Sequence, residues 1–124
     1  MVCLGMVRIL VVDDEPSVRV LADRILSREG YWVQTAPNAR EAIALVLYDL
    51  PSVPNLAILD FNLPGVHGVD FAGDLRRHFP EIRLVFMTGE QPRGAPDGAP
   101  VLMKPFHISE LLAAVRALVG PGNR

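Results

Sequence analysis

Polar or charged residues follow four short apolar runs of this 124-residue sequence, and their types suit phosphate chemistry. They are Asp13 and Asp14 after residues 7–12, Asp60 after 56–59, Thr88 after 84–87, and Lys104 after 101–103. Three carboxylates that lie close together repel one another, and Lys104 offsets only one of them, so a bound cation is expected. Oxygen ligands suit Mg²⁺, which keeps open positions for phosphate oxygens. A phosphoryl group beside Mg²⁺, Lys104 and Thr88 would have its charge neutralised, as phosphoryl transfer requires.

Asp60 is the candidate nucleophile of this set. A carboxylate can itself accept a phosphoryl group and form an aspartyl phosphate. Asp60 stands alone after its apolar run, whereas Asp13 and Asp14 are adjacent and can hold the metal. The residues therefore indicate Mg²⁺-dependent phosphorylation of Asp60.

These side chains meet only if the apolar runs are parallel strands of one sheet. The runs, which also include residues 31–33, are rich in Val, Ile and Leu and lack strict alternation, as in strands buried on both faces. Strand–helix alternation predicts an α/β fold with five parallel strands and helices on both faces. Ligands of such sheets bind beyond the carboxyl ends of the strands.

The helices between the runs are predicted from apolar residues at helical spacing. The sets are Val18, Leu21, Ala22, Ile25 and Leu26; Ala39, Ala42, Ile43, Val46 and Leu47; Ile108, Leu111, Leu112, Val115, Leu118 and Val119; and a weaker set of Phe71, Ala72, Leu75 and Phe79. Pro16 suits a first helical turn, and Gly30 and Gly120 stand where helices should end. Asn38 followed by Glu41 resembles a capping box.

The connection at Gly89–Pro100 differs from the others, because six of its twelve residues are Gly or Pro. A crossover between parallel strands needs about 10–12 residues, so little length remains for a helix. Pro92 and Pro96 would interrupt even two turns. We predict a short, irregular or mobile fourth helix here; a solvated loop without a role is the alternative.

Length and composition place limits on the whole chain. At 124 residues we expect a single domain over 1–124, with a core at about 7–119 and flexible ends. The formal charge of −2 argues against a basic nucleic-acid surface. One cysteine excludes a disulfide framework and suits a reducing, cytoplasmic setting. No apolar run approaches 18 residues, so no membrane span is expected.

The motifs, taken together, resemble one known family. They are VVDDE at 11–15, LDFNLPGVHG at 59–68, MTG at 87–89 and MKPF at 103–106, in order and over almost the whole chain. This combination resembles the receiver domain of two-component response regulators. The resemblance implies a doubly wound, flavodoxin-like sheet of strand order 2-1-3-4-5. It also implies a histidine kinase or phosphotransfer protein as phosphodonor.

The resemblance assigns a role to each matching residue. Asp60 would be the phosphoacceptor, Asp14 would bind Mg²⁺ directly and Asp13 mainly through water, and Asn62 would offer its backbone carbonyl to the metal. Glu15 is expected at the start of the first helix, where its charge suits the helix dipole, or near a metal-bound water.

The same resemblance assigns the residues around the phosphoryl group. Thr88 would hydrogen-bond the phosphoryl oxygens, Lys104 would pair with them, and Gly89 would leave room for the group. The Lys104–Pro105 peptide bond is often cis in the family, and a cis X–Pro bond is energetically accessible.

Two departures from the family pattern concern the output of the domain. Val101 occupies the usual position of a switch aromatic, and the segment after Thr88 is shorter than usual. We therefore hypothesise that phosphorylation mainly orders Gly89–Pro100. Asn62 and Glu90 stand at positions that tune dephosphorylation in the family, and both can orient water, so fairly rapid self-dephosphorylation is expected.

The predicted function is a phosphorylation-controlled signalling module, not a conventional enzyme, that binds neither nucleic acid nor membrane by itself. One alternative is an interaction domain that no longer uses phosphorylation, which the missing switch aromatic favours. Another is an aspartyl-phosphate phosphohydrolase, although the sequence from Asp60 to Asn62 lacks the second carboxylate that such enzymes use as acid and base. The cognate kinase, the downstream target, the oligomeric state and any attached domain are not determined by the sequence.

Overall fold

The computed structural model describes residues 6–48, 53–90 and 98–122 of the chain. Strands and helices alternate along these residues. In chain order they are β1 (Arg8–Val12), α1 (Pro16–Arg28), β2 (Trp32–Ala36), α2 (Ala39–Tyr48), β3 (Leu56–Asp60), β4 (Asn62–Leu63), β5 (Val66–His67), α3 (Gly68–His78), β6 (Arg83–Thr88), β7 (Val101–Met103) and α4 (Ile108–Val119).

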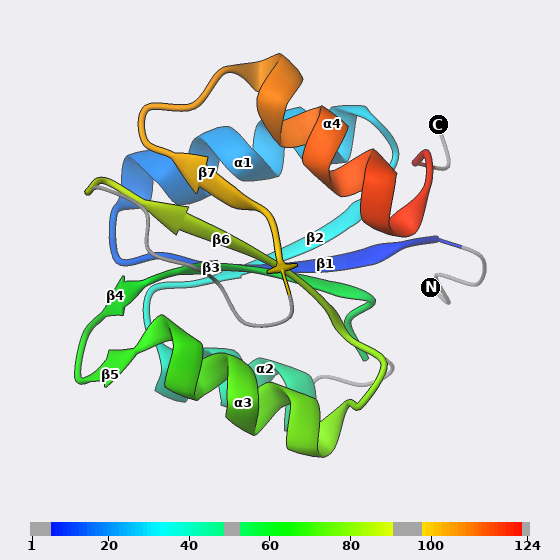
Figure 1. Cartoon of the computed structure of the whole chain (residues 1–124). Coiled ribbons are helices and arrows are strands. Elements are labelled where there is room, and N and C mark those ends of the chain that lie inside the picture. The colour runs from blue at the N-terminus through cyan, green and yellow to red at the C-terminus, as the bar shows by residue number, and fades with distance from the viewer. Residues whose placement is uncertain (1–5, 49–52, 91–97, 123–124) are drawn as a thin grey trace.

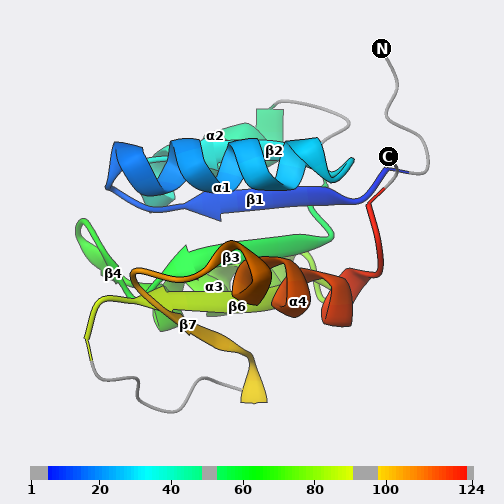
Figure 2. The ribbon, with the colours of Figure 1, turned by 90° about the horizontal axis from the view of Figure 1, so that it is seen from above.

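Five of the strands form one parallel sheet in the order β2-β1-β3-β6-β7. When β4 and β5 are set aside, this is the predicted order 2-1-3-4-5, with β3 in the centre. Helices α1 and α4 cover one face of the sheet, and α2 and α3 cover the other (Figure 1, Figure 2). The predicted doubly wound α/β fold is confirmed, and the carboxyl ends of all five strands point toward one edge.

Each face of the sheet carries its own hydrophobic core. Leu10 and Val12 of β1 pack toward α2 and α3, whereas Ile9 and Val11 pack toward α1 and α4. Successive side chains of a strand point to opposite faces, so a strand between two helical layers needs apolar residues at every position. All five residues of β3 are buried, which explains the uninterrupted apolar run of the sequence.

The helix boundaries follow the predicted signals. Pro16 is the first residue of α1, Gly30 has a φ of 93° just beyond that helix, and Gly120 is the C-cap of α4. The Asn38 side chain accepts a hydrogen bond from the backbone N–H of Glu41 at 2.8 Å. Its amide also donates a hydrogen bond to the Glu41 carboxylate at 3.0 Å, so Asn38 caps the first turn of α2 and Glu41 holds the capping side chain.

The predicted apolar faces of the helices are wider than the faces that are buried. Leu21, Leu47 and Ile108 belong to the predicted sets but are exposed. Leu21 and Leu47 lie at the borders of their apolar stripes, and a helix lying flat on a sheet buries only the centre of the stripe. Ile108 is the first residue of α4, at the end of the helix. On α1 the buried centre consists of Ala22, Ile25 and Leu26.

The hairpin of β4 and β5 was not predicted from the sequence. Asn62 pairs with His67 and Leu63 pairs with Val66, around a turn in which Gly65 has a φ of 77°. The Leu63 side chain is buried in the core beneath α3. The hairpin therefore fixes the chain directly after Asp60 on the body of the domain.

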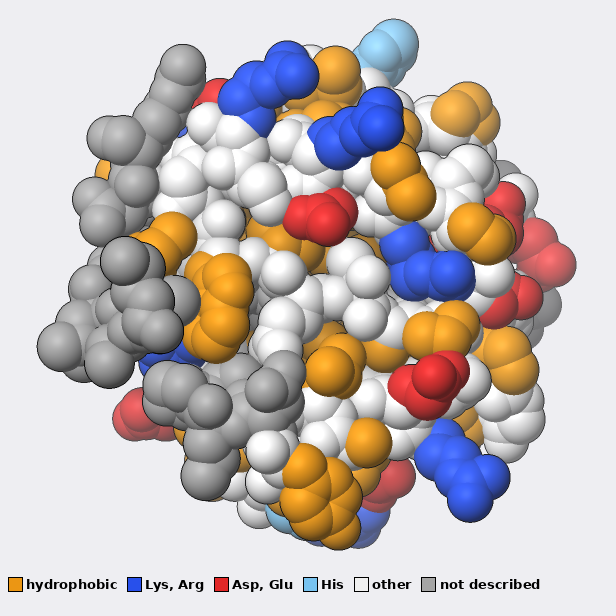
Figure 3. Space-filling model, turned by 180° about the vertical axis from the view of Figure 1, so that it is seen from behind, with side chains coloured by type: hydrophobic (Ala, Val, Ile, Leu, Met, Phe, Trp, Pro, Cys, Tyr) orange, Lys and Arg blue, Asp and Glu red, His pale blue; other side chains and the backbone are white. Residues whose placement is uncertain are grey.

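The predicted short fourth helix at Gly89–Pro100 falls largely on residues 91–97, outside the described residues. Of the chain ends predicted to be flexible, residues 1–5 and 123–124 also lie outside the described residues, as the ranges above show. These remain predictions. The helices of the described residues include none that is both long and apolar enough to cross a membrane. Seen from behind, over the β2 edge, the visible hydrophobic side chains lie scattered among charged ones (Figure 3).

Candidate functional site

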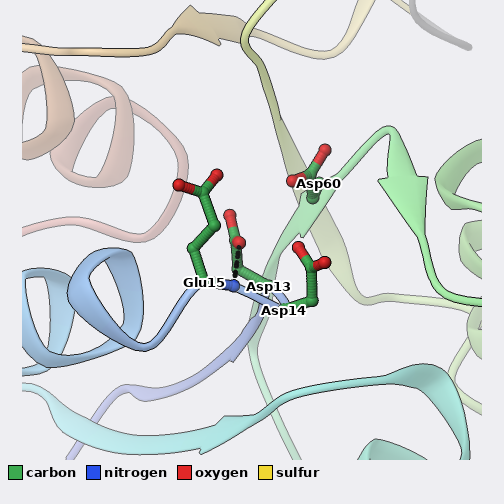
Figure 4. A group of neighbouring side chains, drawn as sticks. All are labelled: Asp13, Asp14, Glu15 and Asp60. Carbon is green, nitrogen blue, oxygen red and sulfur yellow. Dashed lines mark hydrogen bonds between the residues drawn. The ribbon is translucent and has the colours of Figure 1, made fainter.

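The predicted polar residues meet at one edge of the sheet. Asp13 and Asp14 directly follow β1, Asp60 ends β3, Thr88 ends β6, and Lys104 directly follows β7. Carboxylate oxygens of Asp13, Asp14, Glu15 and Asp60, here called the acidic cluster, all lie within 4.8 Å of one another. Figure 4 shows the four side chains converging from the end of β1 and the end of β3. The expected convergence of these residues is therefore confirmed.

Lys104 binds three members of the acidic cluster at once. Its Nζ lies 2.6 Å from Asp13 Oδ2, 2.7 Å from Asp60 Oδ2 and 2.9 Å from Glu15 Oε1. The contacts with Asp60 and Glu15 are hydrogen bonds, and the contact with Asp13 is an ion pair. Burial alone would lower the pKa of Lys104, but its contacts with the three carboxylates together raise the pKa above its usual value.

Asp13 is the most deeply buried member of the acidic cluster, with 0% of its surface exposed. Its Oδ1 accepts a hydrogen bond from the backbone N–H of Glu15 at 2.8 Å. Within the described part of the chain, its Oδ2 has only the ion pair with Lys104 and no hydrogen bond of good geometry. Burial raises the pKa of the Asp13 carboxyl above its usual value, and Lys104 acts in the opposite direction.

Asp60 is 5% exposed and is held through both of its carboxylate oxygens. Oδ1 accepts a hydrogen bond from the backbone N–H of Asn62 at 2.9 Å, and Oδ2 accepts one from Lys104 at 2.7 Å. Behind it, the first residue of α3 is Gly68, whose N–H donates to the Phe61 carbonyl at 2.7 Å. A Cβ on Gly68 would overlap the Asp60 carbonyl oxygen, so this glycine lets α3 start directly against the strand end.

Thr88 and its neighbours form the wall of the site opposite β1. The Thr88 hydroxyl oxygen accepts a hydrogen bond from the Glu90 N–H at 3.1 Å. The Thr88 carbonyl accepts one from the Lys104 N–H at 2.7 Å, and the Lys104–Pro105 bond is cis, as the resemblance implied. Among the described residues, no atom lies within 4 Å of a Cβ built on Gly89, so these residues leave space above it.

Two contacts of the site were not predicted from the sequence. Arg19 of α1 donates from Nη1 to the carbonyl oxygen of Asp13 at 2.6 Å. Glu15 was expected to face the helix dipole or a metal-bound water, yet its side chain reaches Lys104 across the site. For Arg19 the sequence offers one signal, its spacing: it lies four residues after Glu15, so one helical turn brings it back beside the start of α1.

The acidic cluster fits a divalent cation. Four carboxylates face one ammonium, and the buried Asp13 Oδ2 has an oxygen lone pair to offer. The backbone of Asn62 lies beside Asp60 and can add a carbonyl oxygen. A site made of carboxylate and carbonyl oxygens suits Mg²⁺, which commonly uses one or two carboxylates and completes its shell with water or phosphate oxygens.

Comparison with known proteins agrees with this geometry. A family model of the response regulator receiver domain matches residues 9–116. Response regulator MprA of Mycolicibacterium vanbaalenii is 38% identical over 119 residues, which are 91% of this chain and 50% of that protein. Transcriptional regulatory protein TcrA of Mycobacterium tuberculosis is 37% identical over 90% of this chain and 46% of its own length. The chain thus spans about half the length of these curated relatives.

Solved structures show the same similarity. Response regulator protein TrrA of Thermotoga maritima, in complex with Mg²⁺–BeF, is 34% identical with a TM-score of 0.76, covering 92% of this chain and 100% of that one. TrrA has also been solved in complex with histidine kinase ThkA, at 33% identity and a TM-score of 0.77, covering 92% of this chain and 99% of that one. A CheY-like receiver domain from Methanospirillum hungatei gives a TM-score of 0.80 at 28% identity, over 91% of this chain and 93% of its own.

Proposed function

Because the chain belongs to the response regulator receiver domain family and is thus a phosphorylation-controlled signalling domain, we propose that its phosphoacceptor is Asp60. One observation carries the assignment: Asp60 ends the central strand, with one oxygen on the Lys104 ammonium and the other on the Asn62 N–H. The other members of the acidic cluster come from one short segment, 13–15. They are placed to bind a metal beside Asp60.

The proposed reaction transfers a phosphoryl group from a phosphohistidine to an Asp60 carboxylate oxygen. The P–N bond breaks as the P–O bond forms, and its electron pair returns to the ring nitrogen. The other ring nitrogen of the phosphohistidine carries a proton, so the histidine leaves as neutral imidazole. Each oxygen of Asp60 accepts one hydrogen bond, from Lys104 or from the Asn62 N–H, and keeps a second lone pair that can attack phosphorus. Lys104 then pairs with a phosphoryl oxygen, and the Thr88 hydroxyl turns from Glu90 to hydrogen-bond another.

We assign the metal to Asp13, Asp14 and Asp60, with the backbone carbonyl of Asn62. When bound, Mg²⁺ neutralises charge on the carboxylates and on the transferred group. Asp13 is the least exposed of these ligands and is fixed on both sides, by the Glu15 N–H on its carboxylate and by Arg19 on its carbonyl. These contacts hold Asp13 in place, so the chain need not reorganise it when a cation binds.

A histidine kinase or phosphotransfer protein is the proposed donor. TrrA, which is similar over 92% of this chain, forms such a complex with ThkA. Beside the acidic cluster, α1 presents the exposed side chains of Val20 and Leu21, which are 50% and 44% exposed. Together with Pro16 and Arg24 they line a shallow hollow of about 500 Å³. This surface lies next to the site and suits the apolar face of a donor helix.

The proposed setting is the cytoplasm, which the single cysteine of the sequence favours. The domain is proposed to act as a switch and not as a turnover enzyme, because the sequence from Asp60 to Asn62 offers no second carboxylate as acid or base. The chain covers about half of the length of its curated relatives, and we propose that the signalling output lies in a further domain or in a partner protein. The hypothesised ordering of Gly89–Pro100 on phosphorylation would couple the phosphorylated site to that output.

Labelling with acetyl phosphate tests the assignment. The wild-type chain should gain one phosphoryl group, measured as a mass increase, only when Mg²⁺ is present. Asp60→Asn should abolish the gain, and Asp70→Asn, an exposed control on α3, should leave it unchanged. Labelling that survives in Asp60→Asn would refute the assignment, and absence of labelling in the wild type would favour the phosphorylation-independent interaction domain. Steady turnover of a small phosphoester would favour the phosphohydrolase.

A further inference from the structure

We infer that Glu15 is the partner that Lys104 exchanges for the phosphoryl group, so that Glu15 limits how strongly the domain holds phosphate. This inference rests on the proposed function of Asp60 and Lys104. It starts from the contacts of the Lys104 ammonium, which donates hydrogen bonds to Glu15 and Asp60 and forms an ion pair with Asp13. An ammonium has three N–H donors and Lys104 already faces three carboxylates, so a phosphoryl oxygen has to displace one of these contacts.

Burial decides which carboxylate leaves. The side chain of Asp13 is 0% exposed, so removing its ion pair with Lys104 would leave a desolvated charge without that compensation. Asp60 carries the phosphoryl group, so it remains beside Lys104 whichever of the other two carboxylates leaves. The Glu15 side chain is 56% exposed, so water replaces Lys104 around it at little cost. Glu15 is therefore the partner that is released most easily.

The local structure permits this release without a change of fold. Glu15 is the N-cap residue of α1, but its side chain makes no capping hydrogen bond. The backbone of Glu15 does the structural work: its N–H binds Asp13, and its carbonyl accepts from Val18 and Arg19. Side-chain substitutions at Glu15 should consequently leave α1 and the buried carboxylates in place. Because the Glu15 carboxylate contacts Lys104, Glu15 acts as a positioning residue for that ammonium.

Two substitutions separate competition for Lys104 from a general charge effect. Glu15→Gln removes the charge, whereas Glu15→Asp keeps it on a side chain one methylene shorter, which no longer spans the 2.9 Å contact with Lys104 Nζ. If Glu15 competes for Lys104, both variants bind a phosphoryl mimic more tightly than the wild type. If only the negative charge matters, the Asp variant behaves like the wild type.

The probe is beryllofluoride titrated into the full chain at saturating Mg²⁺, followed by amide NMR shifts. We expect its dissociation constant to fall about two- to fivefold in both variants, which corresponds to about 0.4–1 kcal/mol, the range of exposed ion pairs. Mg²⁺ alone, titrated into Glu15→Asp, should bind as in the wild type. An unchanged beryllofluoride affinity in either variant would overturn the inference. A loss of Mg²⁺ affinity in both variants would overturn it too, by making Glu15 a metal ligand.

The controls separate this inference from the proposed function. If the wild-type chain fails to bind beryllofluoride with Mg²⁺, the proposed phosphorylation site is wrong. If the wild type binds and the two variants do not differ from it, only the role of Glu15 is wrong. Thermal unfolding of both variants in metal-free buffer checks that neither substitution has disturbed the fold.

Discussion

Replacing Gly68 by alanine should disturb both the fold and the site, because Gly68 is where α3 touches the phosphoacceptor strand. A Cβ there would overlap the Asp60 carbonyl oxygen and lie 3.0 Å from both the Asp60 carbonyl carbon and the Phe61 Cα. These atoms belong to backbone, which cannot rotate away as a side chain can. The overlap must be relieved by shifting α3 or the end of β3.

The size of the effect follows from three contributions. Overpacking of this kind costs about 1–3 kcal/mol. Weakening the 2.7 Å hydrogen bond from the Gly68 N–H to Phe61 adds about 1 kcal/mol. Alanine is the better helix former by about 1 kcal/mol in a helix interior, and by less at a first helical position. The net expectation is a loss of about 2–3 kcal/mol in the free energy of unfolding.

Urea unfolding measures this loss, and Gly73→Ala is the matched control. Gly73 lies in the same helix, and a Cβ built on it meets no atom of residues 6–48, 53–90 or 98–122 within 4 Å. That variant should gain about 0.5–1 kcal/mol from helix propensity alone. In addition, Gly68→Ala should weaken beryllofluoride binding because Asp60 is displaced, whereas Gly73→Ala should not. A Gly68→Ala protein as stable as Gly73→Ala would refute the steric reasoning.

Three further substitutions test the contacts around the site and the end of the chain. Lys104→Met should lower the free energy of unfolding by about 3 kcal/mol in metal-free buffer, because buried carboxylates lose their counter-ion, and saturating Mg²⁺ should restore part of it; an equal loss in both buffers would contradict this. Arg19→Ala should remove the 2.6 Å hydrogen bond to the Asp13 carbonyl and weaken Mg²⁺ binding, measured by calorimetry, with partial rescue by Arg19→Lys; unchanged affinity would show that Arg19 does not position Asp13. Tyr31→Phe should cost about 1 kcal/mol because the Tyr31 hydroxyl donates to the Gly120 carbonyl. Burial raises the pKa of Tyr31, so its stabilisation is complete below its unfolded pKa of 10.0 and declines as pH rises through the folded pKa; urea titrations at alkaline pH should show a smaller decline in the Phe variant.

The fold was predictable because its signals are local and repeat along the chain. The uninterrupted run LAIL at 56–59, between helical patterns, indicated a strand buried on both faces, and it forms the central strand β3. Pro16 and Gly120 marked helix ends through their own backbone restrictions. The β4–β5 hairpin escaped prediction because strands of two residues are too short to show alternation, although Pro64 followed by Gly65 is a turn signal.

The site was predictable to the level of which residues meet, but not of how they pair. Parallel strands deliver Asp13, Asp60 and Lys104 to one edge whatever their rotamers are. That Glu15 is the third partner of Lys104 depends on how the β1–α1 turn aims an exposed side chain, which no sequence pattern encodes. The need for glycine at position 68 likewise arises from a contact between α3 and β3 that spans eight residues.

The hairpin after Asp60 has a consequence for how the domain responds. Asn62 is clamped by its pairing with His67 and by its N–H bond to Asp60, and the Phe61 ring stacks on His67 at 5.9 Å. The conformational entropy of this loop is therefore lost during folding and not when a ligand arrives. The β4–β5 hairpin should therefore keep its conformation when an ion binds beside Asp60. Any conformational change on binding should then occur on the other side of the site, around Thr88.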